Sequence, residues 1–313
     1  MDNKNVFVAI ALSMSVLLFW GAFFETPRQE LNQSQKNLKV EKNQSLNELT
    51  PNIIPDIKKE PVSRKDSITK TDRVIIENQK IIGSLSLQGA LIDDLSFKNY
   101  KKDLKSEEKV ILLNPKETED GYYIETGWTS IGNKIKVPTN ESLWKFKDNK
   151  VLSEKSPVIL EWDNGEGITF IKKIQLDDKY LFRIKQEIKN KSKDPVELYP
   201  YGQITRNKKP DDVMGFYILH EGFIGVFDGE LQEDDYDEIK ENKISRDAKA
   251  GWLGITDKYW VTAIVPPKDK NFKSSFLYRN AFKANYISNS PVRIGANSSA
   301  SNEIKVFVAA KEV

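Results

Sequence analysis

The first apolar stretch of the chain is long, continuous and free of charge. Val6 to Phe24 reads VFVAIALSMSVLLFWGAFF, nineteen residues without a charged side chain. A helix rises about 1.5 Å per residue, so this stretch would cross the roughly 30 Å hydrocarbon layer of a bilayer. Large Phe23 and Phe24 stand where a signal peptidase needs small residues. The pattern predicts a transmembrane helix with its ends at Val6 and Phe24, and favours an anchor over a cleaved signal peptide.

A polar stretch without aromatic residues follows, from 25 to 70. Asn, Gln, Lys, Glu and Ser dominate it, and Pro27, Pro51, Pro55 and Pro61 interrupt it. Such a composition cannot bury enough apolar surface to offset the conformational entropy of the chain. We therefore predict a flexible stalk over residues 25–70. A helix built around its sparse leucines is the alternative.

From residue 71 onward, short β-branched and aromatic runs alternate with Asn, Asp, Gly and Pro. Leu181 to Lys189 shows this best, because Phe182, Ile184 and Ile188 alternate with charged residues. A period of two places one face of a strand on a core and the other in water. Residues 71–313 are therefore predicted as a mainly β domain, and the charged segment 232–249 as a surface loop or short helix.

Further strands are predicted wherever a similar short run occurs between turn residues. They are Arg73–Ile76, Leu85–Leu87, Val110–Leu113, Thr169–Leu176, Val196–Tyr201, Phe223–Phe227, Trp260–Val265, Phe276–Tyr278, Phe282–Ile287 and the run around Ile304, Val306 and Val308.

Composition excludes several kinds of chemistry. The chain has no cysteine, which rules out disulfides, thiolate catalysis and cysteine-ligated metals, and a single histidine rules out a histidine-rich metal site. Its 48 basic residues nearly balance 46 acidic ones, so no net field favours nucleic acid. The sequence predicts no catalytic residue, no metal ligand and no cofactor.

Two local patterns resemble functional sites, but both fit structural roles better. His220 precedes Glu221, as a general base beside a carboxylate would, yet a lone histidine at a strand end is usually structural. The glycines of DNGEGIT, Gly165 and Gly167, lack the lysine and helix of a phosphate-binding loop. They predict a hairpin turn between Trp162 and Phe170.

The segment GWLGITDKYWVTAIVP, residues 251–266, has the pattern of a tight hairpin. Its glycines permit close backbone approach, its Asp-Lys pair supplies a turn, and an apolar strand follows. We interpret it as structural, with no need for a ligand. The residues concerned are Gly251, Trp252, Gly254, Asp257, Lys258, Tyr259 and Trp260.

Together with the N-terminal NVFVAIALSMSVLLFW and the closing FVAAKEV, this segment resembles the YidC/Oxa/Alb family of membrane protein insertases, in its alphaproteobacterial form. The resemblance implies a cytoplasmic N-terminus, an inner-membrane helix over residues 1–24, and a periplasmic β-supersandwich similar to galactose mutarotases. It also implies a non-enzymatic protein, since mutarotase chemistry needs more than one histidine. Family members continue into five further membrane helices, so the chain resembles their N-terminal part only.

We therefore expect the N-terminal portion of an insertase that assists insertion and folding of integral membrane proteins. The resemblance implies as partners membrane lipid, nascent membrane proteins and the Sec translocon, but no nucleic acid. The alternative is a single-pass periplasmic protein whose sandwich groove binds a carbohydrate or peptide through its aromatic residues.

Overall fold

The computed structural model describes residues 60–103, 105–211, 213 and 219–311. The predicted transmembrane helix Val6–Phe24 and residues 25–59 of the predicted stalk lie outside this range. Within it, no helix has both the length and the apolar character needed to cross a bilayer.

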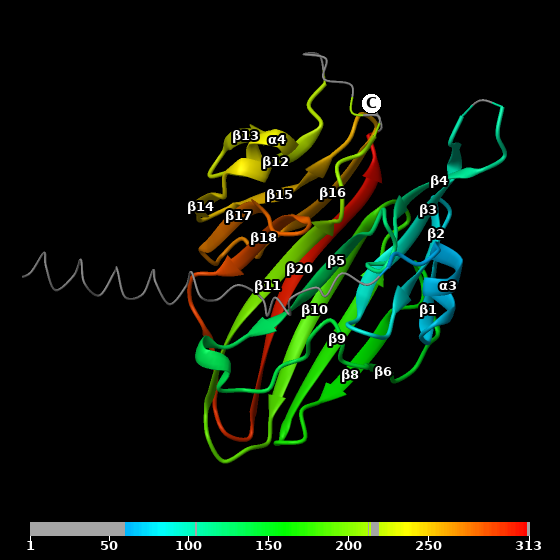
Figure 1. Cartoon of the computed structure of the whole chain (residues 1–313). Coiled ribbons are helices and arrows are strands. Elements are labelled where there is room, and N and C mark those ends of the chain that lie inside the picture. Colours follow the sequence, from blue (N-terminus) through cyan, green and yellow to red (C-terminus); the bar gives the residue numbers. More distant parts are fainter. Residues whose placement is uncertain (1–59, 104, 212, 214–218, 312–313) are drawn as a thin grey trace, which may run out of the picture. The chain divides into compact units, whose positions relative to one another are not determined.

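The described chain is built around two mainly antiparallel β-sheets (Figure 1). The first sheet has the order β14 (Ile244–Ala248), β17 (Phe272–Tyr278), β18 (Phe282–Ser288), β11 (Val196–Arg206), β5 (Tyr122–Thr129), β3 (Leu91–Lys101), β2 (Ile81–Ser86), β1 (Arg73–Glu77) and β7 (Val151–Leu152). Strand β4 (Lys109–Leu113) pairs with β3, and β19 (Val292–Ile294) pairs with β11. Only the pairing of β1 with β7 is parallel among the described strands.

The second sheet has the order β13 (Glu230–Asp234), β12 (Gly222–Phe227), β15 (Gly251–Thr256), β16 (Trp260–Val265), β20 (Ser298–Ala310), β10 (Leu181–Asn190), β9 (Ile168–Leu176), β8 (Val158–Asp163) and β6 (Lys145–Phe146). Short helical segments are α3 (Arg64–Thr69), η1 (Ile131–Asn133) and α4 (Tyr236–Glu241). The fold is therefore mainly β, as the sequence predicts.

One hydrophobic core fills the space between the two sheets. Strand β10 shows how the sequence builds it, because Phe182, Ile184 and Ile188 are at most 2% exposed while Arg183 and Lys185 face water. Burial of each such side chain contributes about 1.5–3 kcal/mol. The strict alternation fixes the register, because a slip by one residue would exchange the two faces.

Every predicted strand lies in or overlaps an observed one. The predicted turn at Gly165 and Gly167 is also confirmed, since β8 and β9 pair with Trp162 opposite Phe170. For residues 232–249 the sequence predicts a surface loop or a short helix. The helix is present as α4, but strands and not a loop flank it, because β13 ends at Asp234 and β14 begins at Ile244. Those flanking strands carry many charges because they lie at sheet edges.

Strand β3 escaped prediction because two acidic residues, Asp93 and Asp94, interrupt its apolar pattern. In the structure each has a cation as its partner. Arg73 of β1 pairs with Asp93, and Arg64 of α3 pairs with Asp94. Paired carboxylates are tolerated at buried positions that unpaired ones would destabilise.

Helix α3 lies inside the range 25–70 that the sequence assigns to a flexible stalk. Ser63 accepts the hydrogen bond from the Asp66 N–H that caps the helix. Ser67 is buried and donates to Glu117 at 3.0 Å, and the Val62 N–H donates to the Glu117 carbonyl at 3.1 Å. Residues 62–70 therefore pack on the β domain, and at this end of the predicted stalk the structure differs from the prediction.

Candidate functional site

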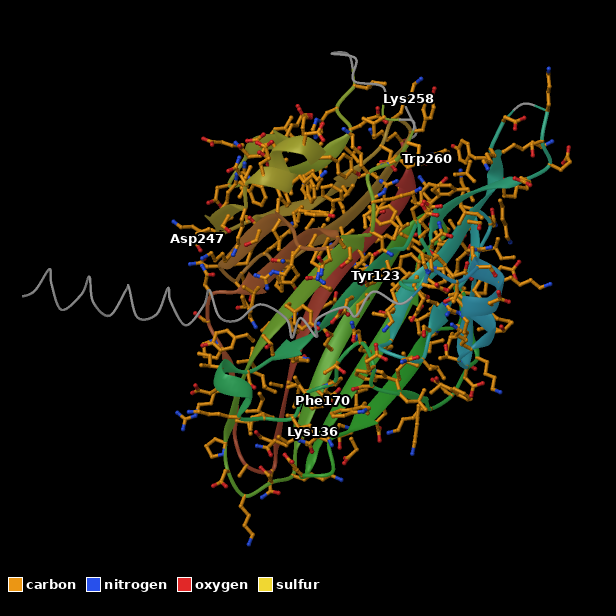
Figure 2. All side chains as sticks on the ribbon, viewed as in Figure 1. Tyr123, Lys136, Phe170, Asp247, Lys258 and Trp260 are labelled. Atoms are coloured by element: carbon orange, nitrogen blue, oxygen red, sulfur yellow. The ribbon has the colours of Figure 1, made fainter. Side chains whose placement is uncertain are left out.

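The segment 251–266 forms an antiparallel hairpin. Strand β15 pairs with β16 from Leu253 opposite Ile264 to Thr256 opposite Val261. The Asp257 N–H donates to the Trp260 carbonyl at 2.9 Å and closes the turn. Lys258 and Trp260, labelled in Figure 2, mark this end of the hairpin.

Both glycines of the hairpin lie against the backbone of a neighbouring strand. A Cβ atom on Gly254 would stand 2.2 Å from the Thr262 carbonyl oxygen, and one on Gly251 would stand 1.8 Å from the Val226 oxygen. Gly251 also has a φ of 141°, which side chains rarely adopt. These positions need glycine for packing.

Asp257 joins the hairpin to the opposite sheet. Its carboxylate accepts from Arg206 Nη1 of β11 at 2.6 Å, and the same nitrogen donates to the Tyr236 hydroxyl at 3.1 Å. The two side chains of the ion pair are only 15% and 14% exposed. The guanidinium also lies 4.6 Å from the ring centre of Tyr122, as a cation–π contact requires.

Trp260 forms a second link between the sheets. Its ring stacks on Phe97 of β3 with 4.7 Å between centroids, and meets Tyr100 edge-on at 5.2 Å. Such pairs add about 0.5–1.5 kcal/mol beyond area burial. The hairpin therefore holds both sheets together at one end, through one ion pair and one aromatic cluster.

The other motif residues lie on the outside of the second sheet. Trp252 is half-buried on the face of β15 that points away from the core. Tyr259, in the turn, is 56% exposed, and Lys258 Nζ lies 5.0 Å from the centre of its ring. The structure thus places the seven motif residues in one hairpin but divides them between the core and the outer surface.

A small cavity between the sheets contains polar groups that the sequence did not single out. It measures about 10 Å³, near the minimum for one water molecule. Lys172, Gln186 and Trp144 line it, with Phe170 labelled in Figure 2. Lys172 Nζ and both polar atoms of Gln186 have no hydrogen-bond partner among the described residues.

Burial dominates the electrostatics of this cavity. It lowers the pKa of Lys172 to about 8, against a smaller raising effect of Glu125. Burial and Glu125 together raise the pKa of Tyr201, whose hydroxyl donates to the Glu125 carboxylate. The cavity is too small for a sugar or a peptide side chain. Every second residue of β9 points into the core, and Lys172 lies in this series between Phe170 and Ile174. The period of two in the sequence could therefore have predicted that Lys172 is buried.

His220 has a structural environment. Its Nε2 lies 2.8 Å from the Phe223 carbonyl oxygen, and its Nδ1 lies 3.8 Å from Asp235. The neighbouring Glu221 accepts from the Lys258 N–H at 3.0 Å. Across the described part of the chain, no three acidic or histidine side chains converge on a point where a metal ion could bind.

Comparison with known protein families shows to which family the chain belongs. Residues 73–313 match the YidC periplasmic domain family. The chain belongs to this family. The resemblance carried by the hairpin motif is thereby confirmed.

YidC relatives match the whole chain. The Membrane protein insertase YidC of Pelagibacter ubique is 44% identical over 313 residues, which cover 100% of this chain and 55% of that protein. The protein of the same name from Methylorubrum extorquens is 35% identical, with 100% and 56% covered. The chain therefore spans about half the length of the curated relatives it matches.

The fold of the YidC domain also has a structural relative. A galactose mutarotase related enzyme from Lactobacillus acidophilus superposes with a TM-score of 0.52 and 13% identity, covering 77% of this chain and 99% of that one. At this identity the likeness shows a shared sandwich fold and says nothing of activity. The predicted mutarotase-like fold of the β domain is confirmed.

Proposed function

We propose that this chain is the N-terminal portion of a membrane protein insertase, and that its β domain is an accessory module that contacts a partner protein. The observation that carries the proposal is the identity of 44% with an insertase over all 313 residues, a range that includes the predicted membrane helix. In this proposal Val6–Phe24 spans the inner membrane with its N-terminus in the cytoplasm, and the β domain lies in the periplasm.

Insertion itself is assigned to the part of the protein that follows this chain. A hydrated, polar groove there would shorten the hydrocarbon path for polar segments of nascent membrane proteins and satisfy groups that lipid leaves unpaired. No bond is made or broken in this process, so the β domain needs no catalytic group. Its contribution is a surface for a partner such as the Sec translocon.

Complementation tests the proposal. The full-length gene is expressed in a host depleted of its own insertase, and insertion of a membrane protein substrate is followed by protease accessibility. We expect the full-length protein to restore insertion and a variant ending at Val313 not to restore it. Absence of insertion with a stably expressed full-length protein would contradict the assignment.

The accessory role needs a separate measurement. Photo-crosslinking from exposed positions of the β domain, in cells with an intact translocon, should yield adducts with a translocon subunit. Equal insertion rates with and without residues 60–311, together with no adduct at any position, would contradict the accessory role and leave the insertase assignment intact.

A further inference from the structure

Part of the outward face of the second sheet is apolar. In an antiparallel sandwich the outer faces are normally polar, because they meet water. Here one row across five strands runs Ile224, Gly254, Ala263, Phe307 and Leu181, each paired with the next. Within this row, which crosses strands β12, β15, β16, β20 and β10 (Figure 1), Gly254 and Ala263 are buried, Ile224 and Leu181 are half-buried, and Phe307 is exposed.

A second row on the same face is apolar too. Leu231 lies opposite Val226, which lies opposite Trp252. Leu231 is 56% exposed and Phe307 is 36% exposed, and Val226 and Trp252 are half-buried. We name the surface formed by Ile224, Val226, Leu231, Trp252, Ala263 and Phe307 the outer apolar face.

Four cations lie directly beside it on the same side of the sheet. Arg183 stands opposite Lys305, and Lys185 stands opposite Lys173. Like charges at opposed positions destabilise a sheet, and both of these pairs are like-charged. Among the described strand pairings, Glu303 of β20, opposite Lys185, is the one carboxylate that stands opposite any of the four cations. None of these four side chains is in an ion pair within the described residues. We name this group the cationic corner.

We infer that the outer apolar face and the cationic corner together bind the surface of an anionic lipid bilayer. Trp, Phe and Leu side chains that are partly exposed suit the boundary between headgroups and acyl chains, and each Lys or Arg near an anionic surface strengthens binding to it. A bilayer surface offers many phosphates in a plane, which matches four neighbouring cations on one face of a sheet better than the few carboxylates of a protein helix would.

The inference rests on the proposed function in one respect, since the predicted helix Val6–Phe24 is what would keep the domain near a bilayer. It adds that the second sheet, and not the first, faces the lipid. The family motif would then act at two places, with Trp260 and Asp257 inside the sandwich and Trp252 at the membrane.

Spin labelling of the whole chain tests the inference, because a chain without cysteine accepts a single label at any chosen site. Labels are placed by Leu231→Cys and Phe307→Cys on the outer apolar face, and by Ile111→Cys, 43% exposed on β4 of the first sheet, as the control. The chain is reconstituted in nanodiscs of phosphatidylcholine with or without phosphatidylglycerol. The accessibility of each spin label to oxygen and to a water-soluble nickel complex then reports how deeply the label lies in the bilayer.

We expect oxygen to be favoured over nickel at positions 231 and 307 in anionic nanodiscs, and nickel to be favoured at 111. The double variant Arg183→Glu, Lys305→Glu should return positions 231 and 307 to the values of position 111. Lys105→Glu with Lys109→Glu, the same charge change in the turn before β4 and at the start of β4, should not. Far-UV circular dichroism confirms that the variants are folded.

Two outcomes would overturn the inference. Water-like accessibility at positions 231 and 307 in anionic nanodiscs would exclude lipid and leave a protein partner for the face. Equal depth with and without phosphatidylglycerol would exclude a role for the cationic corner. A label at Ser13→Cys separates these results from failure of the proposed anchoring, since only that failure would leave Ser13 accessible to nickel.

Discussion

Lys172 places an ammonium group inside the sandwich without a hydrogen-bond acceptor among the described residues. Its Nζ makes a cation–π contact with the Trp144 ring, with 5.0 Å from Nζ to the ring centre. Burying a charge without a partner is unfavourable, and the lowered pKa expresses that cost. The residue therefore destabilises the fold it belongs to.

Lys172→Met should raise the free energy of unfolding at pH 7 by roughly 2 kcal/mol, because the side-chain volume stays and the buried charge is lost. Chemical denaturation measures the change. Lys173→Met, one residue along β9 and exposed, is the control and should have no comparable effect. A stability loss in Lys172→Met would show that the ammonium has an unseen partner.

The same group makes stability depend on pH in the alkaline range. The folded pKa, about 8, lies below the ordinary value of 10.5, so between these values the unfolded chain binds more protons. Stability of the native protein should therefore rise as pH increases through this window, and the cost is fully present below it. The difference between native protein and Lys172→Met should shrink from pH 8 to pH 10; a constant difference would contradict the assignment.

Gly254 tests the close approach of β15 and β16 at a single residue. Gly254→Ala should lower the free energy of unfolding by about 2–3 kcal/mol, since the added Cβ would stand 2.2 Å from a carbonyl oxygen. Gly295→Ala is the control, because its nearest neighbour would be 3.3 Å away. Thermal or urea unfolding compares the two, and equal effects would refute the packing argument.

At the scale of elements, the β15–β16 hairpin works as a link between sheets. Asp257→Ala leaves the Arg206 guanidinium almost buried without its carboxylate, and we expect a loss of roughly 3 kcal/mol. Asp237→Ala is the comparison, because it breaks an exposed ion pair with Lys209 in which the Asp237 side chain is 79% exposed. It should lower the free energy of unfolding by less than about 1 kcal/mol. Adding Arg206→Met to Asp257→Ala should recover part of the loss; strict additivity would mean that the two residues act independently.

Helix α3 packs on the β domain, although the sequence assigns it to the stalk. Its Arg64 and Ser67 contact Asp94 and Glu117, so we expect limited trypsin digestion of the whole chain to cut after Lys58 or Lys59 and to spare Lys65. Mass spectrometry of the resistant fragment gives its first residue. Arg64→Met should make Lys65 susceptible, and cleavage there in the native protein would restore the longer stalk that the sequence predicts.

At the scale of the molecule, one core shared by both sheets implies one unfolding unit. Side chains from β3, β10, β16 and β18 belong to the same buried cluster. A fragment of residues 60–313 should therefore unfold in a single transition, with tryptophan fluorescence and far-UV circular dichroism coinciding. Two separated transitions would mean that each sheet has a core of its own.

Sequence reasoning located the strands with clear alternation and missed those whose pattern depends on distant partners. Strand β10 was evident because its period of two is unbroken. Strand β3 was not, since Asp93 and Asp94 become acceptable only when Arg73 and Arg64 arrive from other elements. The hairpin of residues 251–266 was recognised as a motif, but its contacts with Arg206 and Phe97 come from the opposite sheet and leave no local signal.

The sequence by itself determined that the chain has a long apolar stretch, a polar segment after it and a β-rich remainder, because hydrophobic period and composition are local properties. It also determined the family, through a motif whose residues are contiguous. Only the tertiary structure decided that Asp257 and Trp260 join two sheets, that Lys172 is buried without a hydrogen-bond partner among the described residues, and that apolar residues gather on one outer face. These facts depend on strand order and register, which bring together residues far apart in the chain.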